Sequence, residues 1–109
     1  MHITDQAAIQ GQPYRNVLLS QINDSCLRLA AFEGEYVWHY HSSSDELFIV
    51  VQGMLEIDLE NGSTLRLSPW DAITIPARTV HRTRAIGRTV NLTFEHLAAD
   101  TVIVDRQAI

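Results

Sequence analysis

The sequence has little of what marks specialised classes of protein: it has one cysteine, no lysine and no long apolar run. Cys26 has no second cysteine for an internal disulfide, and it lies in the alternating stretch CLRLAAF, where we expect a buried structural thiol. No apolar stretch approaches the ~20 residues of a membrane-spanning helix, so no membrane partner is expected. The opening MHITDQAAIQGQP lacks the basic start and apolar core of a secretory signal, which predicts a cytoplasmic protein.

Basic charge is also scarce. The eight arginines are outnumbered by acidic residues, and the formal net charge is −5 at pH 7. Binding to a phosphate backbone needs a concentrated basic surface, so no nucleic-acid partner is expected. Arg78, Arg82, Arg84 and Arg88 crowd one segment. This favours a solvated surface stripe, and the alternative is that Arg78 presents its guanidinium to an anionic ligand.

With 109 residues the chain is expected to form one domain, spanning 1–109, without linkers. Residues 1–12 and 105–109 are predicted to be loose ends or to pair across a dimer.

Alternation of apolar and polar residues with a period of two runs through most of the sequence, and no segment has a helical stripe. This predicts an all-β protein of eight or nine short strands, closed into a barrel or a two-sheet jelly roll. The predicted strands cover residues 15–21, 26–33, 36–41, 46–53, 54–60, 63–68, 72–77, 80–85 and 89–97. Asn61-Gly62 is predicted to form a two-residue type I′ hairpin turn.

Two histidines one residue apart are the clearest chemical signal. On a strand, His39 and His41 point to the same face with backbones ~7 Å apart, so two imidazoles can converge on one ion at ~2.1 Å. A loop over 42–44 returns the chain so that Glu46 can approach the same point, with Asp45 facing away. Parity then places Phe48 and Val50 on the inner face beside Glu46.

His81 is the best third nitrogen, because it opens a strand after the tight turn at Pro76. A metal site is favoured. The alternative is that His39 and His41 are ordinary polar residues, satisfied beside Trp38 and Tyr40.

Two stretches carry a family resemblance. GEYVWHYHSSSDELFIVVQG, residues 34–53, resembles the first motif of the cupin family: a glycine, His-x-His, four residues, Glu, six residues, Gly. LSPWDAITIPARTVHRTRA resembles the second motif, a Pro-Gly-Asp turn leading through a strand to Pro-x-Gly-x-x-His. The resemblance covers about half of the chain. It implies a double-stranded β-helix and a metal set of His39, His41, Glu46 and His81.

The second motif departs from the family pattern at three positions. Trp70 and Arg78 stand where the family usually has glycine, and Ala85 stands where it often has asparagine. Glycine is favoured where a turn needs positive φ, so Trp70 and Arg78 imply altered turns or strain of order 1 kcal/mol. The four ligands are unaffected.

Three imidazoles and one carboxylate leave open positions on a five- or six-coordinate ion. We expect one divalent metal ion per chain, and Fe, Mn, Zn, Ni, Co and Cu all accept such ligands. The resemblance implies an enzyme, of dioxygenase, isomerase or cyclase-like type, that acts on a small oxygen-rich molecule chelated by the ion. The alternatives are a non-catalytic binding or sensing module, and an ion that only stabilises the barrel.

The expected ligand pocket lies between the ion and an apolar wall. Its candidate residues are Phe48, Ile57, Ile75, Arg78 and Leu92. A homodimer is also expected, because Leu47, Ile49 and Val51 form an outward apolar row that is too large to leave exposed.

Overall fold

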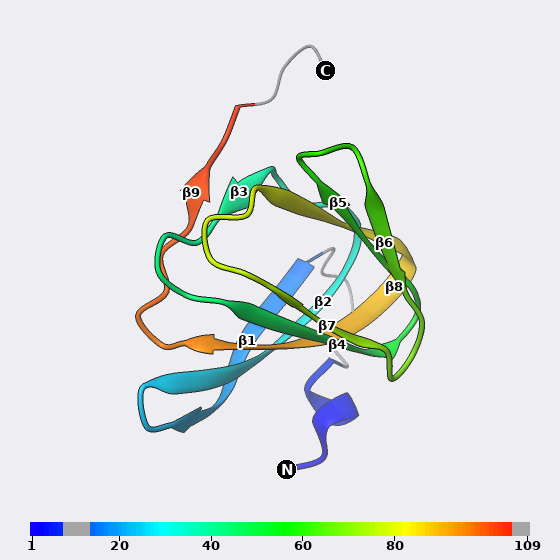
Figure 1. The fold of residues 1–109 in the computed structure, drawn as a ribbon. Coiled ribbons are helices and arrows are strands. Elements are labelled where there is room, and N and C mark those ends of the chain that lie inside the picture. Colours follow the sequence, from blue (N-terminus) through cyan, green and yellow to red (C-terminus); the bar gives the residue numbers. More distant parts are fainter. Residues whose placement is uncertain (8–13, 106–109) are drawn as a thin grey trace.

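The structure is a computed structural model that describes residues 1–7 and 14–105, and it consists almost entirely of strands curled into a barrel (Figure 1). The described elements are a 3₁₀ helix, η1 (Ile3–Ala7), and the strands β1 (Tyr14–Ile22), β2 (Ser25–Glu35), β3 (His39–Tyr40), β4 (Glu46–Gln52), β5 (Leu55–Leu59), β6 (Thr64–Leu67), β7 (Ala72–Ile75), β8 (His81–His96) and β9 (Val102–Ile103). The prediction of an all-β fold is confirmed.

Strand β8 organises the barrel. One edge pairs antiparallel with β2, and the other pairs with β5 through residues 81–85 and with β4 through residues 90–94. The two strands predicted over 80–85 and 89–97 are therefore one strand of 16 residues. Gly87, with φ of 70°, lies between the two halves and lets the backbone turn there without a break in the element.

The hairpin between β5 and β6 forms as expected, but the predicted type I′ turn is wrong. Gly62 has a φ of 92°, and Asn61 is not among the positive-φ residues. The Gly62 amide donates to the Leu59 carbonyl at 3.0 Å, and the Leu59 amide donates to the Ser63 carbonyl at 2.8 Å. This is a three-residue loop with glycine in the left-handed position. The Asn61 side chain accepts from the Ser63 amide at 2.9 Å, so it stabilises the loop without adopting positive φ.

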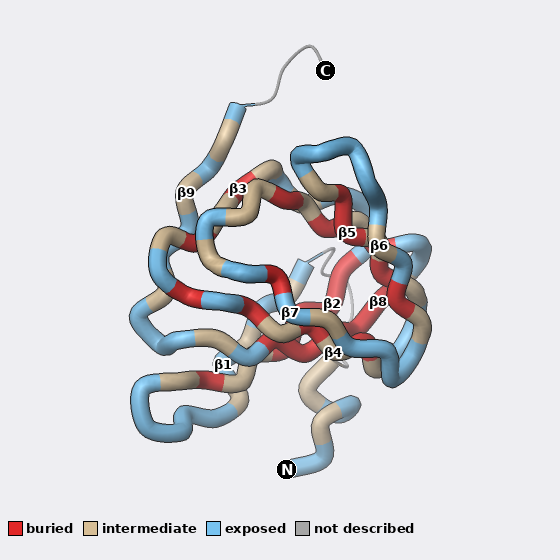
Figure 2. Tube along the Cα trace, in the orientation of Figure 1, coloured by how far each residue is buried: buried red, intermediate tan, exposed pale blue. Residues whose placement is uncertain are grey.

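Two apolar clusters lie on opposite faces of the curled sheet. Buried positions, red in Figure 2, run along much of β2 and β8. The first fills the barrel interior and consists of Ala30, Phe32, Phe48, Val50, Leu55, Ile57, Leu67, Ile75 and Ala85. The second consists of Leu29, Ala31, Val90 and Leu92 on the outer face. Alternate residues of β2 and β8 thus serve different clusters, as the period of a strand requires. Because both faces of these strands carry buried apolar residues, the apolar pattern alone does not show which face is the interior.

The outward row on β4 is partly covered by the chain itself. Ile49 and Val51 pack against the outer cluster together with Ile3 and Ala7 of η1. The homodimer stays a prediction. Of the terminal residues predicted to be loose or exchanged, 8–12 and 106–109 lie outside the described residues. The described part of the chain contains no helix of the length and apolarity that crossing a membrane requires.

The turns at the two replaced glycines keep the glycine conformation. Trp70 has a φ of 71° and Arg78 a φ of 65°, although both carry a Cβ. The Trp70 amide donates to the Val50 carbonyl and the Arg78 amide to the His41 carbonyl, each at 2.7 Å. These bonds hold the two residues in the left-handed region, which is strained for a residue with a Cβ.

Candidate metal centre

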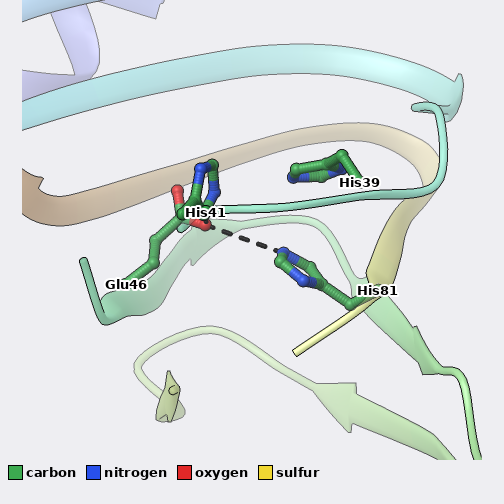
Figure 3. Close-up of side chains that lie close together, drawn as sticks. All are labelled: His39, His41, Glu46 and His81. Atoms are coloured by element: carbon green, nitrogen blue, oxygen red, sulfur yellow. Dashed lines mark hydrogen bonds and ion pairs between the residues drawn. The ribbon is translucent and has the colours of Figure 1, made fainter. Parts of the chain in front are cut away.

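Four buried side chains from separate parts of the barrel converge on one point (Figure 3). His39 lies on β3, His41 directly follows it, Glu46 begins β4 and His81 begins β8. Pairing of His39 with His81 across β3 and β8 brings their rings to a centroid distance of 4.4 Å. One ligand atom from each of the four residues lies within 4.8 Å of the others. The predicted ligand set is thus assembled by strand pairing.

Each of the three imidazoles is oriented by a backbone carbonyl. His39 Nδ1 lies 2.8 Å from the Val37 oxygen, His41 Nδ1 lies 2.6 Å from the Asp100 oxygen, and His81 Nδ1 lies 2.8 Å from the Thr79 oxygen. A carbonyl can only accept, so each Nδ1 carries the proton and each Nε2 is left for the centre of the site. Metal-binding histidines are commonly fixed in this way.

The carboxylate completes the group from the β4 side. Glu46 Oε1 lies 3.0 Å from His41 Nε2 and 3.7 Å from His81 Nε2. Burial opposes ionisation of Glu46, but the hydrogen bond from His41 and the nearby ring of His81 outweigh it and lower its pKa to about 2. The hydrogen bond to Glu46 raises the pKa of His41 to about 9. Glu46 is therefore a carboxylate at neutral pH, and His41 carries a proton that a metal ion would displace.

The other two histidines are prepared differently. Burial lowers the pKa of His39 to about 4, so its imidazole is neutral at physiological pH. His81 is 1% exposed, and its Nε2 is buried with no hydrogen-bond partner among the described residues. A buried polar nitrogen without a partner costs free energy unless a ligand satisfies it.

These observations fit a divalent ion. Two neighbouring ligand atoms at ~2.1 Å from an octahedral ion lie about 3.0 Å apart, which is the separation of His41 Nε2 and Glu46 Oε1. Three imidazole nitrogens and one carboxylate oxygen suit iron, manganese, cobalt, nickel, copper and zinc alike. His39, His41, Glu46 and His81 would hold the ion.

The ligand group lies beside a cavity of about 110 Å³. His39, His41 and Glu46 line it directly, and the ring of His81 lies 6.2 Å from that of the lining residue Phe48, measured between centroids. The rest of the wall is both apolar and polar. It consists of Tyr14, Asn16, Arg28, Ala30, Phe32, Tyr36, Phe48, Thr83, Asn91, Thr93, Glu95 and Thr101.

Of the five predicted pocket residues, the structure brings Phe48 to the cavity wall. Ile57 and Ile75 are buried in the inner apolar cluster, and Leu92 belongs to the outer cluster. Arg78 is exposed and its guanidinium donates to the Ser42 carbonyl at 3.4 Å. Among the residues that the structure describes, the wall includes none of these four.

The polar half of the wall was missed by the reasoning from sequence. Asn91, Thr93 and Glu95 face inward from β8, and Arg28 faces them from β2. The residues of segment 89–97 alternate between polar and apolar, but this alternation does not show which of the two sets faces inward. The prediction placed the apolar set inside, whereas the barrel turns the polar set toward the ligand group.

Of the arginines predicted to form a solvated stripe, Arg78 is exposed, and Arg82, Arg84 and Arg88 are partly buried. Arg82 and Arg84 donate to the buried carboxylate of Asp58 at 2.8 and 2.6 Å. Their side chains are 28% and 26% exposed. They lie outside the cavity wall and form a separate polar cluster.

Known proteins are similar to this chain in sequence and in fold. Residues 28–97 match the model of the cupin domain family. The chain is 51% identical over 96 residues to the uncharacterized protein YdbB of Bacillus subtilis (strain 168), covering 88% of this chain and 85% of that protein. It superposes with a TM-score of 0.81 and 27% identity on a cupin-2 domain containing protein from Shewanella frigidimarina NCIMB 400, over 88% of this chain and 93% of that chain.

A more distant likeness concerns the fold alone. The DMSP lyase DddQ from Ruegeria pomeroyi DSS-3 matches with a TM-score of 0.75 and 18% identity, over 89% of this chain and 54% of that chain. The family match covers both motifs, the four converging side chains and most of the barrel, and the fold is the double-stranded β-helix that the motifs implied. The chain belongs to the cupin family.

Proposed function

We propose that this chain is a metal-dependent enzyme that acts on a small oxygen-rich molecule bound at His39, His41, Glu46 and His81. The observation that carries the proposal is the convergence of the four ligand atoms beside a cavity that can admit a guest. A structural ion is normally enclosed by its protein ligands, whereas a catalytic site keeps a position open. The bound ion would act as a Lewis acid on an oxygen atom of the substrate.

The residues of the chain have distinct roles in this proposal. The histidines and Glu46 hold the ion, and the backbone carbonyls of Val37, Asp100 and Thr79 keep the imidazoles oriented. Ala30, Phe32 and Phe48 form the apolar side of the cavity, where they exclude water from the bound molecule. Exclusion of water strengthens electrostatic interactions in the site.

Metal content tests the site. Protein purified from its own host is analysed for metals, then stripped with a chelator and reloaded. We expect about one divalent ion per chain in the wild type, and loss of that ion in His39→Ala and His81→Ala. His96→Ala is the matched control, because His96 is an exposed histidine outside the ligand group. Full metal content in the two ligand variants would refute the site.

Turnover tests the activity. The metal-loaded protein is incubated with an α-hydroxy acid, an α-keto acid and a 1,3-diketone while oxygen uptake and product formation are followed. Conversion of one class that disappears on chelation would support the enzyme. A compound that raises the melting temperature and is recovered unchanged would instead identify a binding or sensing module.

A further inference from the structure

We propose that Glu95 and Arg28 form a second polar anchor in the cavity, which binds a hydroxyl group of the same small molecule that the metal centre holds. The inference rests on the proposed function, because it assumes that the ligand is chelated at the metal centre. It adds the class of the ligand: a small molecule with a chelating oxygen pair and at least one further hydroxyl group.

Strand pairing places Glu95 next to the ligand group. Leu47 of β4 pairs with Phe94 of β8, so Glu46 and Glu95 occupy the next positions of these neighbouring strands. Both carboxylates line the cavity. One of them belongs to the metal centre, and the other lies outside it.

The carboxylate of Glu95 is buried and incompletely satisfied. Its side chain is 11% exposed, and Oε2 has no hydrogen-bond partner among the described residues. Oε1 lies 3.9 Å from Arg28 Nε, which is too long for a hydrogen bond. Burial, and after it the charge of Glu46, raises the pKa of Glu95, as expected for a carboxyl that lacks close donors. Such a group binds a donor from a ligand favourably.

Arg28 supplies the complementary chemistry. It pairs with Thr93 across β2 and β8, and its side chain is 33% exposed at the cavity wall. Among the described residues its guanidinium has only the 3.9 Å ion pair with Glu95, and Oε2 of Glu95 has no hydrogen-bond partner. A hydroxyl group satisfies both, because its hydrogen donates to Glu95 while its oxygen accepts from Arg28.

The size of the cavity limits the ligand. A dry cavity of ~150 Å³ holds benzene, which has six heavy atoms. The present cavity is smaller, about 110 Å³, and it is open to solvent on one side, so a bound molecule must be small and must extend into the open mouth. Three-carbon hydroxy acids are small chelators, with six heavy atoms in lactate and seven in glycerate, which makes them a suitable pair of probes. Both chelate through the carboxylate and the 2-hydroxyl, and glycerate alone carries a 3-hydroxyl.

The test is a titration of the cobalt(II)-loaded protein with each acid, followed through the visible absorption of the bound cobalt. A charge-assisted hydrogen bond contributes enough to change affinity about tenfold. We therefore expect the wild type to bind glycerate about tenfold more tightly than lactate. Glu95→Leu should abolish this preference without weakening lactate binding. Glu60→Leu, at an exposed carboxylate in the β5–β6 loop, should keep the wild-type preference.

Cobalt stoichiometry and circular dichroism confirm that each variant is folded and loaded. Should Glu95→Leu fail to fold, Glu95→Gln, which keeps the shape and removes the charge, must still reduce the preference for glycerate. Equal affinity of the wild type for both acids, or an unchanged preference in the Glu95 variants, would overturn this inference and leave the metal centre standing. A wild type that binds no cobalt would overturn the proposed function together with it.

Discussion

Two buried carboxylates in this barrel, Asp58 and Glu46, have basic side chains as neighbours, and they differ in how far those neighbours are satisfied within the chain. Asp58 accepts from Thr64 Oγ1 at 2.7 Å, Arg82 Nε at 2.8 Å and Arg84 Nε at 2.6 Å. Glu46 has a hydrogen-bonding contact with His41, while the buried Nε2 of His81 has no partner among the described residues.

The two clusters differ in how their hydrogen-bond donors are used. The hydrogen bond from Arg84 is the main cause that lowers the pKa of Asp58. Burial raises this pKa, but the further hydrogen bonds from Arg82 and Thr64 help to hold it far below its usual range. Arg82 also bonds to Glu35 and Arg84 to Glu56, so the donors of this cluster are used within the chain. At Glu46 the three imidazoles are oriented inward by backbone carbonyls, and among the described residues the buried Nε2 of His81 is left without a partner.

Metal binding should produce the largest difference between the two clusters. A ligand at a thousand times its dissociation constant stabilises the folded state by about 4 kcal/mol, which raises the melting temperature of a domain of this size by roughly 15 °C or more. We expect this shift on adding Zn²⁺ to the stripped wild type, measured by calorimetry. His81→Ala should lose the shift and Asp58→Ala should keep it. Equal shifts in wild type and His81→Ala would contradict the site.

Removal of Asp58 should cost stability without affecting metal binding. Asp58→Ala leaves Arg82 and Arg84 without their shared acceptor, and these arginines are only partly exposed. We expect a loss of about 2–3 kcal/mol in the free energy of unfolding, measured by urea denaturation. Metal content should stay at the wild-type level. A loss below ~0.5 kcal/mol would show that the cluster is no more than a set of surface ion pairs.

The two clusters should also differ in their response to alkaline pH. The folded-state pKa of His41, about 9, lies above its ordinary value of 6.5 because of Glu46. Its contribution to stability is therefore fully present below pH 6.5 and is lost as the pH rises through 9. The cations at Asp58 are arginines, which stay charged over this range.

We expect the free energy of unfolding of the metal-free wild type to fall between pH 6.5 and 9 in chemical denaturation. Glu46→Gln, which removes the charge that raises the His41 pKa, should flatten this decline. Asp58→Ala should retain it. A decline of the same size in Glu46→Gln would show that another group titrates.

The smallest effect concerns the strained turn after β6. Trp70 is 73% exposed and adopts a φ of 71°, which costs a residue with a Cβ about 1 kcal/mol relative to glycine. Trp70→Gly should raise the free energy of unfolding by about 1 kcal/mol in urea denaturation. Trp70→Ala is the control and should give no such gain, because it keeps the Cβ. If both variants behave alike, the indole and not the backbone determines the effect.

Several features of this protein follow from the order of the residues alone. The period-two alternation determined that the chain forms strands, and His-x-His followed by Glu46 determined that three ligands lie near one another. These are local properties, since they depend on side-chain direction along one strand and on a short loop. At Trp70 and Arg78 the resemblance to the second motif, which usually has glycine there, implied altered turns or strain.

Tertiary structure decided which face of each strand became the interior. Both faces of β8 are covered, so its alternation could not show whether Leu92 or its neighbours Asn91 and Thr93 line the cavity. It also decided that Arg28 and Glu95, far apart in sequence, face each other, and that Arg82 and Arg84 turn to Asp58. Those contacts depend on strand register around the closed barrel, which a single strand's sequence does not contain.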